Sequence, residues 1–145
     1  MSNISYRAAA LIIRDNKLLM AKNINHSCYY TVGGGIEFNE SSEEAVIREL
    51  KEETGKQFEI EKLVFIQERF CTVSLQNHHE IVFFYLMKDN PNIIINDNDY
   101  TDQGTKDTLH WLPIKKLSEY DIAPEFLKTK SLEKFNNIEH IISHE

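Results

Sequence analysis

The sequence predicts an α+β domain built on a mixed β-sheet. Segments rich in β-branched and aromatic residues lie both before and after one amphipathic, helix-like segment between Ser41 and Gly55. These segments do not alternate in regular strand–helix–strand units, which argues against a purely parallel sheet. The chain has 145 residues and no internal repeat or low-complexity linker, so we expect a single domain over residues 1–145.

The first expected elements are a β-hairpin and a short strand that leads into glycine. The pattern predicts a strand at residues 6–14, a tight turn at Asp15–Asn16 and the hairpin partner at residues 17–22. A further short strand is predicted at residues 29–32. The polar stretch 23–28 is expected to be a loop. Gly33, Gly34 and Gly35 follow, and because glycine has no Cβ they permit a tight turn or a close approach to a ligand.

The helix-like segment carries signals for both of its ends. Asn39 or Ser41 is expected to cap its start, and Ser41 with Glu44 fits the capping-box pattern. Gly55 is expected to end it, because glycine readily adopts the left-handed backbone found after many helices. The sequence therefore predicts a loop, a helix and a loop, in that order.

The second half of the chain is expected to hold three clear strands and a helical C-terminus. Strands are predicted at residues 58–70, 79–87 and 109–112. A polar connection is predicted at residues 74–78, between the first two of these strands. The Asn- and Asp-rich stretch 90–107 predicts a weak strand at 93–95 and then a long loop. A helical turn is expected over 113–117, and one or two terminal helices over 124–142.

Composition limits the class of partner. With 16 Lys and Arg against 23 Asp and Glu, the formal net charge is −7, which argues against a partner that is a long nucleic acid. Small phosphorylated ligands remain compatible, since a bound metal outweighs the overall charge locally. The N-terminal apolar run is too short for a signal peptide or a membrane span, so we expect no membrane partner, a cytoplasmic location, and free thiols at Cys28 and Cys71.

Three glutamates crowd one face of the expected helix. At about 100° per residue, Glu49, Glu52 and Glu53 fall within a sector of about 100°, with Arg48 on its margin. Like charges at this spacing destabilise a bare helix by roughly a few tenths of a kcal/mol per pair, and a bound cation would reverse that effect. Carboxylate oxygens without a nearby Cys favour Mg²⁺, with Mn²⁺ as the alternative.

This segment resembles the Nudix box, the signature of hydrolases that act on a nucleoside diphosphate linked to another group. The residues that fill the family pattern at its spacing are Gly34, Glu40, Arg48, Glu49, Leu50, Glu52, Glu53 and Gly55. Lys56 replaces the aliphatic residue that ends the pattern, a departure that concerns packing at the helix exit rather than the acids. The resemblance covers about 23 of 145 residues and implies the Nudix fold, a mixed β-sheet sandwiched between α-helices.

The same resemblance implies roles for the acids. Glu52 and Glu53 are expected to be the core Mg²⁺ ligands, and Glu49 is expected either to add a ligand or to polarise the attacking water. The carbonyl of Gly33 is a further expected ligand, although a tight turn alone would also explain the three glycines.

Two residues of the box have competing interpretations. Arg48 is expected to pair with Glu52 or Glu40 and to hold carboxylates in their binding rotamers, whereas a plain surface salt bridge would contribute at most about 1 kcal/mol. Glu40 is expected either to help bind metal or to interact with the helix dipole.

In this family the base can instead lie outside the box, on a later loop. The candidates for that role here are Glu80, Asp99, Asp102 and Asp107. A solvated surface carboxylate is the alternative for each of them, and the sequence does not distinguish among the four.

The resemblance implies a Mg²⁺-dependent hydrolase that cleaves the pyrophosphate bond of a nucleoside triphosphate or an ADP-sugar type of substrate. Arg48, Glu49 and Glu53 are the expected catalytic residues. A catalytically silent Nudix domain that senses a nucleotide is the alternative, and the intact acids favour the enzyme. The expected partner is a small nucleotide, and a homodimer is compatible with the family.

Overall fold

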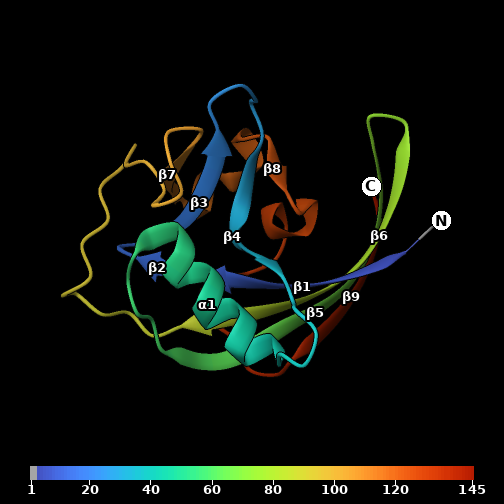
Figure 1. The fold of residues 1–145 in the computed structure, drawn as a ribbon, viewed down its shortest axis with the longest axis horizontal. Helices are drawn as coiled ribbons and strands as arrows, with labels where there is room; N and C mark the ends of the chain where they lie inside the picture. Colours follow the sequence, from blue (N-terminus) through green and yellow to red (C-terminus); the bar gives the residue numbers. More distant parts are fainter. Residues whose placement is uncertain (1–2) are drawn as a thin grey trace.

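The computed structural model describes residues 3–145 (Figure 1). Its strands are β1 (Ile4–Leu11), β2 (Ile13–Arg14), β3 (Lys17–Asn23), β4 (Tyr29–Gly35), β5 (Ile60–Val73), β6 (Gln76–Met87), β7 (Asp107–Pro113), β8 (Ile122–Ala123) and β9 (Glu139–His144). Its helices are α1 (Ser42–Thr54) and two short 3₁₀ helices, η1 (Ile114–Glu119) and η2 (Glu125–Lys128). Within residues 3–145, no helix is both long and apolar enough to cross a membrane.

The strands form one mixed sheet. Its order is β2-β3-β4-β1-β6-β5-β9, with β7 paired to β3 and β8 paired to β4. β1 runs antiparallel to β4 but parallel to β6, and β9 runs parallel to β5. β5 and β6 form a long antiparallel hairpin whose tip projects from the body of the molecule (Figure 1). The predicted α+β class with a mixed sheet is confirmed.

The second half of β1, from Ala8 to Leu11, is buried on both faces, and its side chains alternate between two cores. Ala8 and Ala10 belong to the core under α1, where Leu50 is fully buried. Ala9 and Leu11 belong to the core on the opposite face, which η1 and η2 help to cover. The sheet is therefore covered on both faces, by an α-helix on one and by 3₁₀ turns on the other.

The prediction of one or two terminal helices over residues 124–142 is wrong. This segment contains only the short η2 and then the beginning of β9, which adds to the edge of the sheet beside β5. Asn136 and Asn137 favour a turn rather than a helix. The isoleucine-rich segment that follows suits a strand, because Ile141 is buried and Ile142 is exposed, as period-two alternation requires.

Several boundaries also differ from expectation. The connection expected over 74–78 shrinks to Ser74 and Leu75, both at positive φ, so residues 76–78 belong to β6. The weak strand expected over 93–95 does not form, although Ile93 and Ile95 are buried. Hydrophobic burial alone therefore explains that pattern. The tight turn at Asp15–Asn16 is confirmed, with both residues at positive φ.

Candidate functional site

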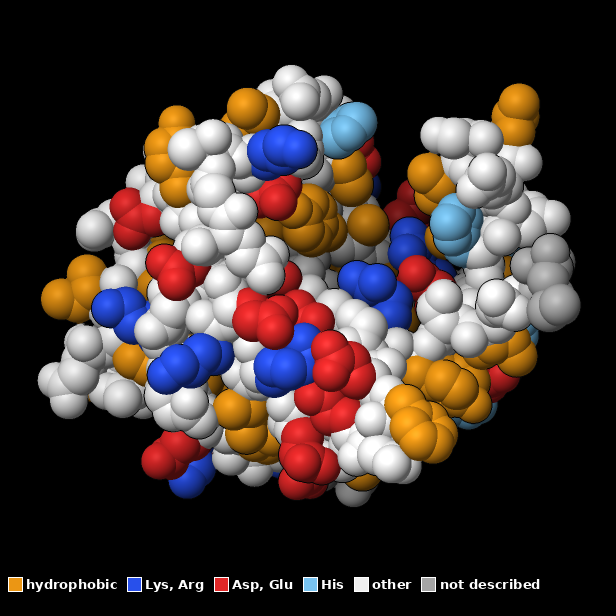
Figure 2. Space-filling model, viewed as in Figure 1, with side chains coloured by type: hydrophobic (Ala, Val, Ile, Leu, Met, Phe, Trp, Pro, Cys, Tyr) orange, Lys and Arg blue, Asp and Glu red, His pale blue; other side chains and the backbone are white. Residues whose placement is uncertain are grey.

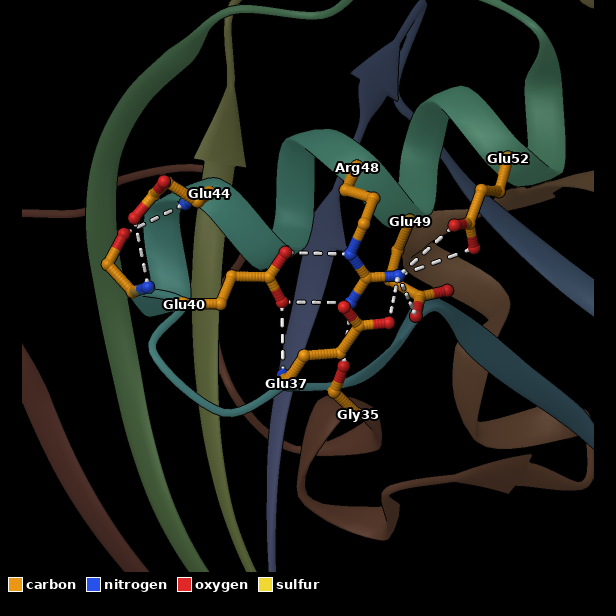
Figure 3. A network of polar contacts seen from close by, with 8 residues as sticks. Gly35, Glu37, Glu40, Glu44, Arg48, Glu49 and Glu52 are labelled. Carbon is orange, nitrogen blue, oxygen red and sulfur yellow. Dashed lines mark hydrogen bonds and ion pairs between the residues drawn. The ribbon is translucent and has the colours of Figure 1, made fainter.

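α1 is fixed at both ends by the caps that the sequence predicts. The Ser41 hydroxyl accepts a hydrogen bond from the Glu44 amide, and the Glu44 carboxylate accepts one from the Ser41 amide, both at 3.1 Å. At the other end Gly55 has left-handed backbone, with φ 72°, and its N–H donates to the Lys51 carbonyl. Because Leu50 is buried, the rotation of the helix is fixed, and Figure 3 shows Arg48, Glu49 and Glu52 on the same side of α1.

Two glycines of β4 let the strand pass close to its neighbours. A Cβ on Gly34 would lie 2.4 Å from Cδ of Glu49, so the missing side chain makes room for that carboxylate. A Cβ on Gly33 would lie 2.2 Å from the Ala8 carbonyl oxygen on β1, and its φ of 154° is one that other residues rarely adopt. The glycines therefore belong to the strand itself and are not only a turn after it.

Arg48 is the centre of an acidic network (Figure 3). Its Nε and Nη2 donate to the two carboxylate oxygens of Glu40, at 2.7 and 2.9 Å, which is a bidentate pair. Its Nη1 donates to Glu49 at 2.9 Å and to Glu52 at 3.3 Å. Nη2 also donates to the Gly35 carbonyl at 2.9 Å, so one side chain connects helix, loop and strand. Both pairings considered from the sequence, with Glu40 and with Glu52, are present.

Glu40 is held in place by donors on two sides. Besides Arg48, the Glu37 amide donates to its carboxylate at 3.1 Å. The hydrogen bond from Arg48, and to a smaller extent that from the Glu37 amide, lowers the pKa of Glu40 to about 2. In this structure Glu40 therefore orients Arg48, while the metal-binding and helix-dipole roles considered from the sequence stay predictions.

Glu53 lies on the same helix in a different environment. Its carboxyl is partly buried, and desolvation raises its pKa to about 8, with further contributions from the negative charges of Glu49 and Asp107. The Gly33 backbone amide and the positive charge of Arg7 act in the opposite direction, and more weakly. Glu53 is therefore the carboxylate in this site whose charged form has the most to gain from a nearby cation.

Two acids from outside the box lie next to it. Asp107, at the start of β7, accepts a hydrogen bond from the Tyr30 hydroxyl at 3.0 Å, and its charge reaches Glu53. Asp102 lies at the end of α1, where its amide donates to the Glu53 carbonyl at 2.6 Å. Its carboxylate lies 3.2 Å from the position of a Cβ on Gly55.

The other two candidates have their polar contacts outside the box, although Glu80 lines one pocket together with Gly33 and Gly34. Glu80 pairs with Arg69 at 3.2 Å and with Arg7 at 4.0 Å. Asp99 accepts a hydrogen bond from the Asn96 amide at 2.8 Å, within its own loop. Of the four acids considered from the sequence, the structure thus places Asp102 and Asp107 next to the helix and Glu80 in the wall of the pocket beside the β4 glycines.

The donor set fits a hard divalent cation in its chemistry. As the side chains stand, no three His, Cys, Asp or Glu residues in 3–145 are gathered closely enough to hold a metal ion. Arg48 instead supplies the positive charge that faces Glu49 and Glu52. Within residues 3–145 no Lys or Arg forms an ion pair with Glu53, and its raised pKa is the observation that favours an oxygen-ligated cation beside it.

A pocket of about 250 Å³ opens next to the β4 glycines. Figure 2 shows a hollow between the body of the molecule and the projecting hairpin, above and to the right of the acidic patch, with charged side chains inside it. Sequence reasoning did not single out three of its polar lining residues, Arg7, Gln67 and Arg69. The alternation of side chains along a strand could have indicated two of them, because Gln67 and Arg69 lie on the same face of β5 as the buried Phe65.

Comparison with known proteins gives consistent matches. The family profile described as NUDIX domain matches residues 5–132. A nudix hydrolase of Caenorhabditis elegans is 39% identical over 72 residues, which are 45% of this chain and 20% of that protein. An ADP-ribose pyrophosphatase of Methanocaldococcus jannaschii is 48% identical over 48 residues, which are 31% of this chain and 28% of that protein. The matched segments span less than a third of either curated relative.

The solved structures agree on the fold. The MutT protein of Bacillus halodurans superposes with a TM-score of 0.66 at 16% identity, with 94% of this chain and 89% of that chain covered. At this identity the likeness concerns the fold alone, and it confirms the expected Nudix fold. Because the family profile covers most of the chain and the box residues stand at the family spacing, this chain belongs to the Nudix domain family.

Proposed function

We propose that this chain is a Mg²⁺-dependent pyrophosphohydrolase that cleaves the pyrophosphate bond of a nucleoside diphosphate linked to another group. The observation that carries the proposal is Glu53, a partly buried carboxyl whose ionised form is opposed by Glu49 and Asp107. A divalent cation would neutralise this local charge and so stabilise the ionised site. Membership of the Nudix family supports the same reaction class.

The box acids would hold the metal in this proposal. Glu49, Glu52 and Glu53 provide carboxylate oxygens, and the Gly33 carbonyl is a further oxygen ligand; oxygen donors suit Mg²⁺, with Mn²⁺ as the alternative. When bound, such an ion supplies charge neutralisation at the phosphates and a bound water of lowered pKa. Glu49 takes the proton from the attacking water, and its contact with Gly34 restricts where the carboxylate can lie.

Arg48 is a positioning residue in this proposal. It donates to Glu49 at 2.9 Å, while Glu40 holds its guanidinium from the other side with two hydrogen bonds. This arrangement limits the rotamers of Glu49 before a substrate arrives, which is how outer residues support a reacting group. The guanidinium of Arg48 donates to acceptors on the helix, the loop and the strand, whereas an isolated surface ion pair joins only two side chains.

We propose a nucleoside triphosphate or an ADP-sugar as the substrate class. A curated relative is named an ADP-ribose pyrophosphatase, which supports the ADP-sugar branch of this proposal. The net charge of −7 favours a small nucleotide over a long nucleic acid. A cytoplasmic location and a homodimer stay predictions.

The experiment that tests the proposal is a substrate panel. The purified protein is incubated with Mg²⁺ and nucleoside triphosphates, ADP-ribose, dinucleoside polyphosphates or nucleotide sugars, and released phosphate is measured with and without added phosphatase. We expect turnover of at least one member and none without divalent metal. If no member is hydrolysed, the alternative of a catalytically silent nucleotide-sensing domain replaces the enzyme.

A variant pair tests the metal assignment. Glu53→Gln keeps the size of the side chain and one acceptor oxygen but removes its charge, and it is expected to lower turnover by roughly two orders of magnitude or more while the protein stays folded. Glu43→Gln removes one charge from an exposed position of α1 and is expected to keep the wild-type rate. Wild-type turnover in Glu53→Gln would remove Glu53 from the metal site.

A further inference from the structure

The pocket beside the β4 glycines lies on the face of the sheet opposite α1. Three adjacent strands contribute its inner wall, and their lining residues pair in register: Ala9 on β1 with Phe84 on β6, and Val82 on β6 with Gln67 on β5. Pro124, between β8 and η2, also lines it. Ala9, Val82 and Phe84 are at most 5% exposed, so the inner end of the pocket is largely apolar.

Gln67 is the polar residue at that inner end. Its side chain is fully buried, and its Nε2 donates to the Ser143 hydroxyl on β9 at 2.9 Å. Its Oε1 has no hydrogen-bond partner among residues 3–145. A buried acceptor without a donor is unfavourable, and folded proteins contain few of them. An unpaired acceptor in the wall of a pocket therefore indicates a donor on the ligand.

The charged residues around the pocket already have partners. Arg69 donates to Glu80 at 3.2 Å and also pairs with Glu145, and Arg7 lies 4.0 Å from Glu80. Because these charges largely neutralise each other, the pocket is poorly suited to a phosphate group. Among residues 3–145, the polar atom of this pocket wall that is buried without a hydrogen-bond partner is Oε1 of Gln67, a neutral acceptor.

The pocket and the acidic site share a border at β4. Gly33 and Gly34 line it, and Gly34 also borders the carboxylate of Glu49. Arg7 lines it as well, and its charge acts on Glu53. A nucleotide with its phosphates at the box acids therefore has this pocket within reach for its other end, in the hollow that Figure 2 shows beside the acidic patch.

We infer that Gln67 selects the base of the nucleotide by accepting a hydrogen bond from its exocyclic amino group at Oε1. The inference rests on the proposed function and names the substrate as a nucleotide of adenine, cytosine or guanine. At about 250 Å³ the pocket is smaller than the roughly 300–1,000 Å³ of sites that enclose a whole drug-sized ligand, so it holds one part of a nucleotide.

A base fits this pocket better than a sugar does. The apolar side chains of Ala9, Val82 and Phe84 suit the faces of a flat ring, whose polar atoms lie only at its edge. A sugar carries hydroxyls around its whole rim, and several of them would face these apolar side chains without partners. A ring with one amino group directed at Gln67 satisfies the buried acceptor and leaves its other edge towards the polar rim.

Matched nucleotides that differ by one amino group test the inference. AMP is compared with purine riboside monophosphate, CMP with 2-pyrimidinone riboside monophosphate and GMP with IMP, and Kd is measured by NMR titration without metal. Binding is measured instead of turnover, so the outcome is separate from that of the hydrolysis panel. We expect the amino-bearing member of at least one pair to bind roughly tenfold more tightly. Equal Kd within every pair, or no binding of AMP, CMP and GMP, would overturn the inference.

Variants at Gln67 assign the preference to its acceptor. Gln67→Met has similar size but no polar atom, and we expect it to bind both members of the selected pair equally, with an unchanged or higher Tm because the unpaired acceptor is gone. Ser143→Ala leaves Oε1 in place, and we expect it to keep the preference. A Gln67→Met protein with the wild-type preference would overturn the inference, and Gln67→Leu provides the same test if the Met variant does not fold.

Discussion

The carboxylate of Glu49 occupies the space that a side chain at position 34 would need. A Cβ on Gly34 would lie 2.4 Å from Cδ of Glu49 and 2.5 and 2.6 Å from its two oxygens. Strand β4 and helix α1 can therefore place this acid between them only because residue 34 has no Cβ. The residue type at position 34 of the strand therefore determines where the Glu49 side chain of the helix can lie.

Gly34→Ala is expected to lower kcat at least tenfold while changing the free energy of unfolding by less than about 1 kcal/mol. The added methyl group meets the end of a flexible side chain, so Glu49 moves and the backbone does not have to. Steady-state kinetics and urea unfolding measure the two effects. Gly35→Ala is the matched control, because its nearest neighbour would be the Tyr6 carbonyl oxygen at 4.0 Å. A wild-type kcat in Gly34→Ala would contradict the positional role of Glu49.

Gly33→Ala is expected to act on stability instead. Its Cβ would lie 2.2 Å from the Ala8 carbonyl oxygen and 2.8 Å from the Ala9 Cα, and neither backbone atom can move without disturbing β1 in the middle of the sheet. The φ of 154° adds strain for any residue with a Cβ. We expect a loss of roughly 2–4 kcal/mol in the free energy of unfolding, measured by urea denaturation. A loss as small as that of Gly34→Ala would show that β1 and β4 can separate locally.

Arg48→Lys is expected to lower kcat more than tenfold with little change in KM. Lysine keeps the charge but cannot donate to both oxygens of Glu40 while also reaching Glu49 and the Gly35 carbonyl. The acid would then sample more rotamers, and this affects the reaction rather than substrate binding. Steady-state kinetics at saturating Mg²⁺ separate kcat from KM.

A second variant distinguishes positioning by Arg48 from a contribution of charge alone. Glu40→Gln leaves Arg48 in place but weakens its bidentate partner, and we expect it to lower kcat in the same direction as Arg48→Lys and by a smaller factor. If Arg48→Lys is as active as the wild type, the guanidinium geometry is unnecessary and Arg48 acts only as a positive charge.

Local signals account for what the sequence predicted about the site. The Ser41–Glu44 capping box, the Gly55 stop and the Arg48–Glu52 pair connect residues within a few positions of each other, so their geometry follows from helix periodicity alone. The fold class follows from the same kind of local pattern.

The features that were missed depend on contacts between distant segments. β9 is a strand because one edge of β5 accepts it, and the sequence of residues 124–142 does not show that edge. Gln67 becomes notable only when the pairing of β5 with β6 places Val82 beside it and its Oε1 is left unpaired. Likewise, Asp107 influences Glu53 because the pairing of β7 with β3 places it there.

Glu53 gives the metal-free protein a pH-dependent stability. Its pKa is about 8 in the folded chain against an ordinary value of 4.5, mainly because of its burial. A carboxyl whose pKa rises on folding is most favourable when protonated, so its contribution to stability is full below pH 4.5 and is lost as the pH rises through about 8. Over this window the wild type is expected to lose at most about 5 kcal/mol from this group.

Glu53→Gln is expected to remove this loss, because the amide stays neutral at every pH. Urea unfolding in EDTA should give similar stabilities for variant and wild type near pH 5, and a more stable variant near pH 8.5. Glu43→Gln controls for the removal of one negative charge from α1. Addition of Mg²⁺ at pH 8.5 should stabilise the wild type more than Glu53→Gln, since a ligand at free concentration c that binds only the folded state raises stability by RT ln(1 + c/Kd) and therefore more when its affinity is higher. Parallel pH profiles for the two proteins in EDTA would show that solvent reaches Glu53 freely, and the argument for a cation beside it would then lose its basis.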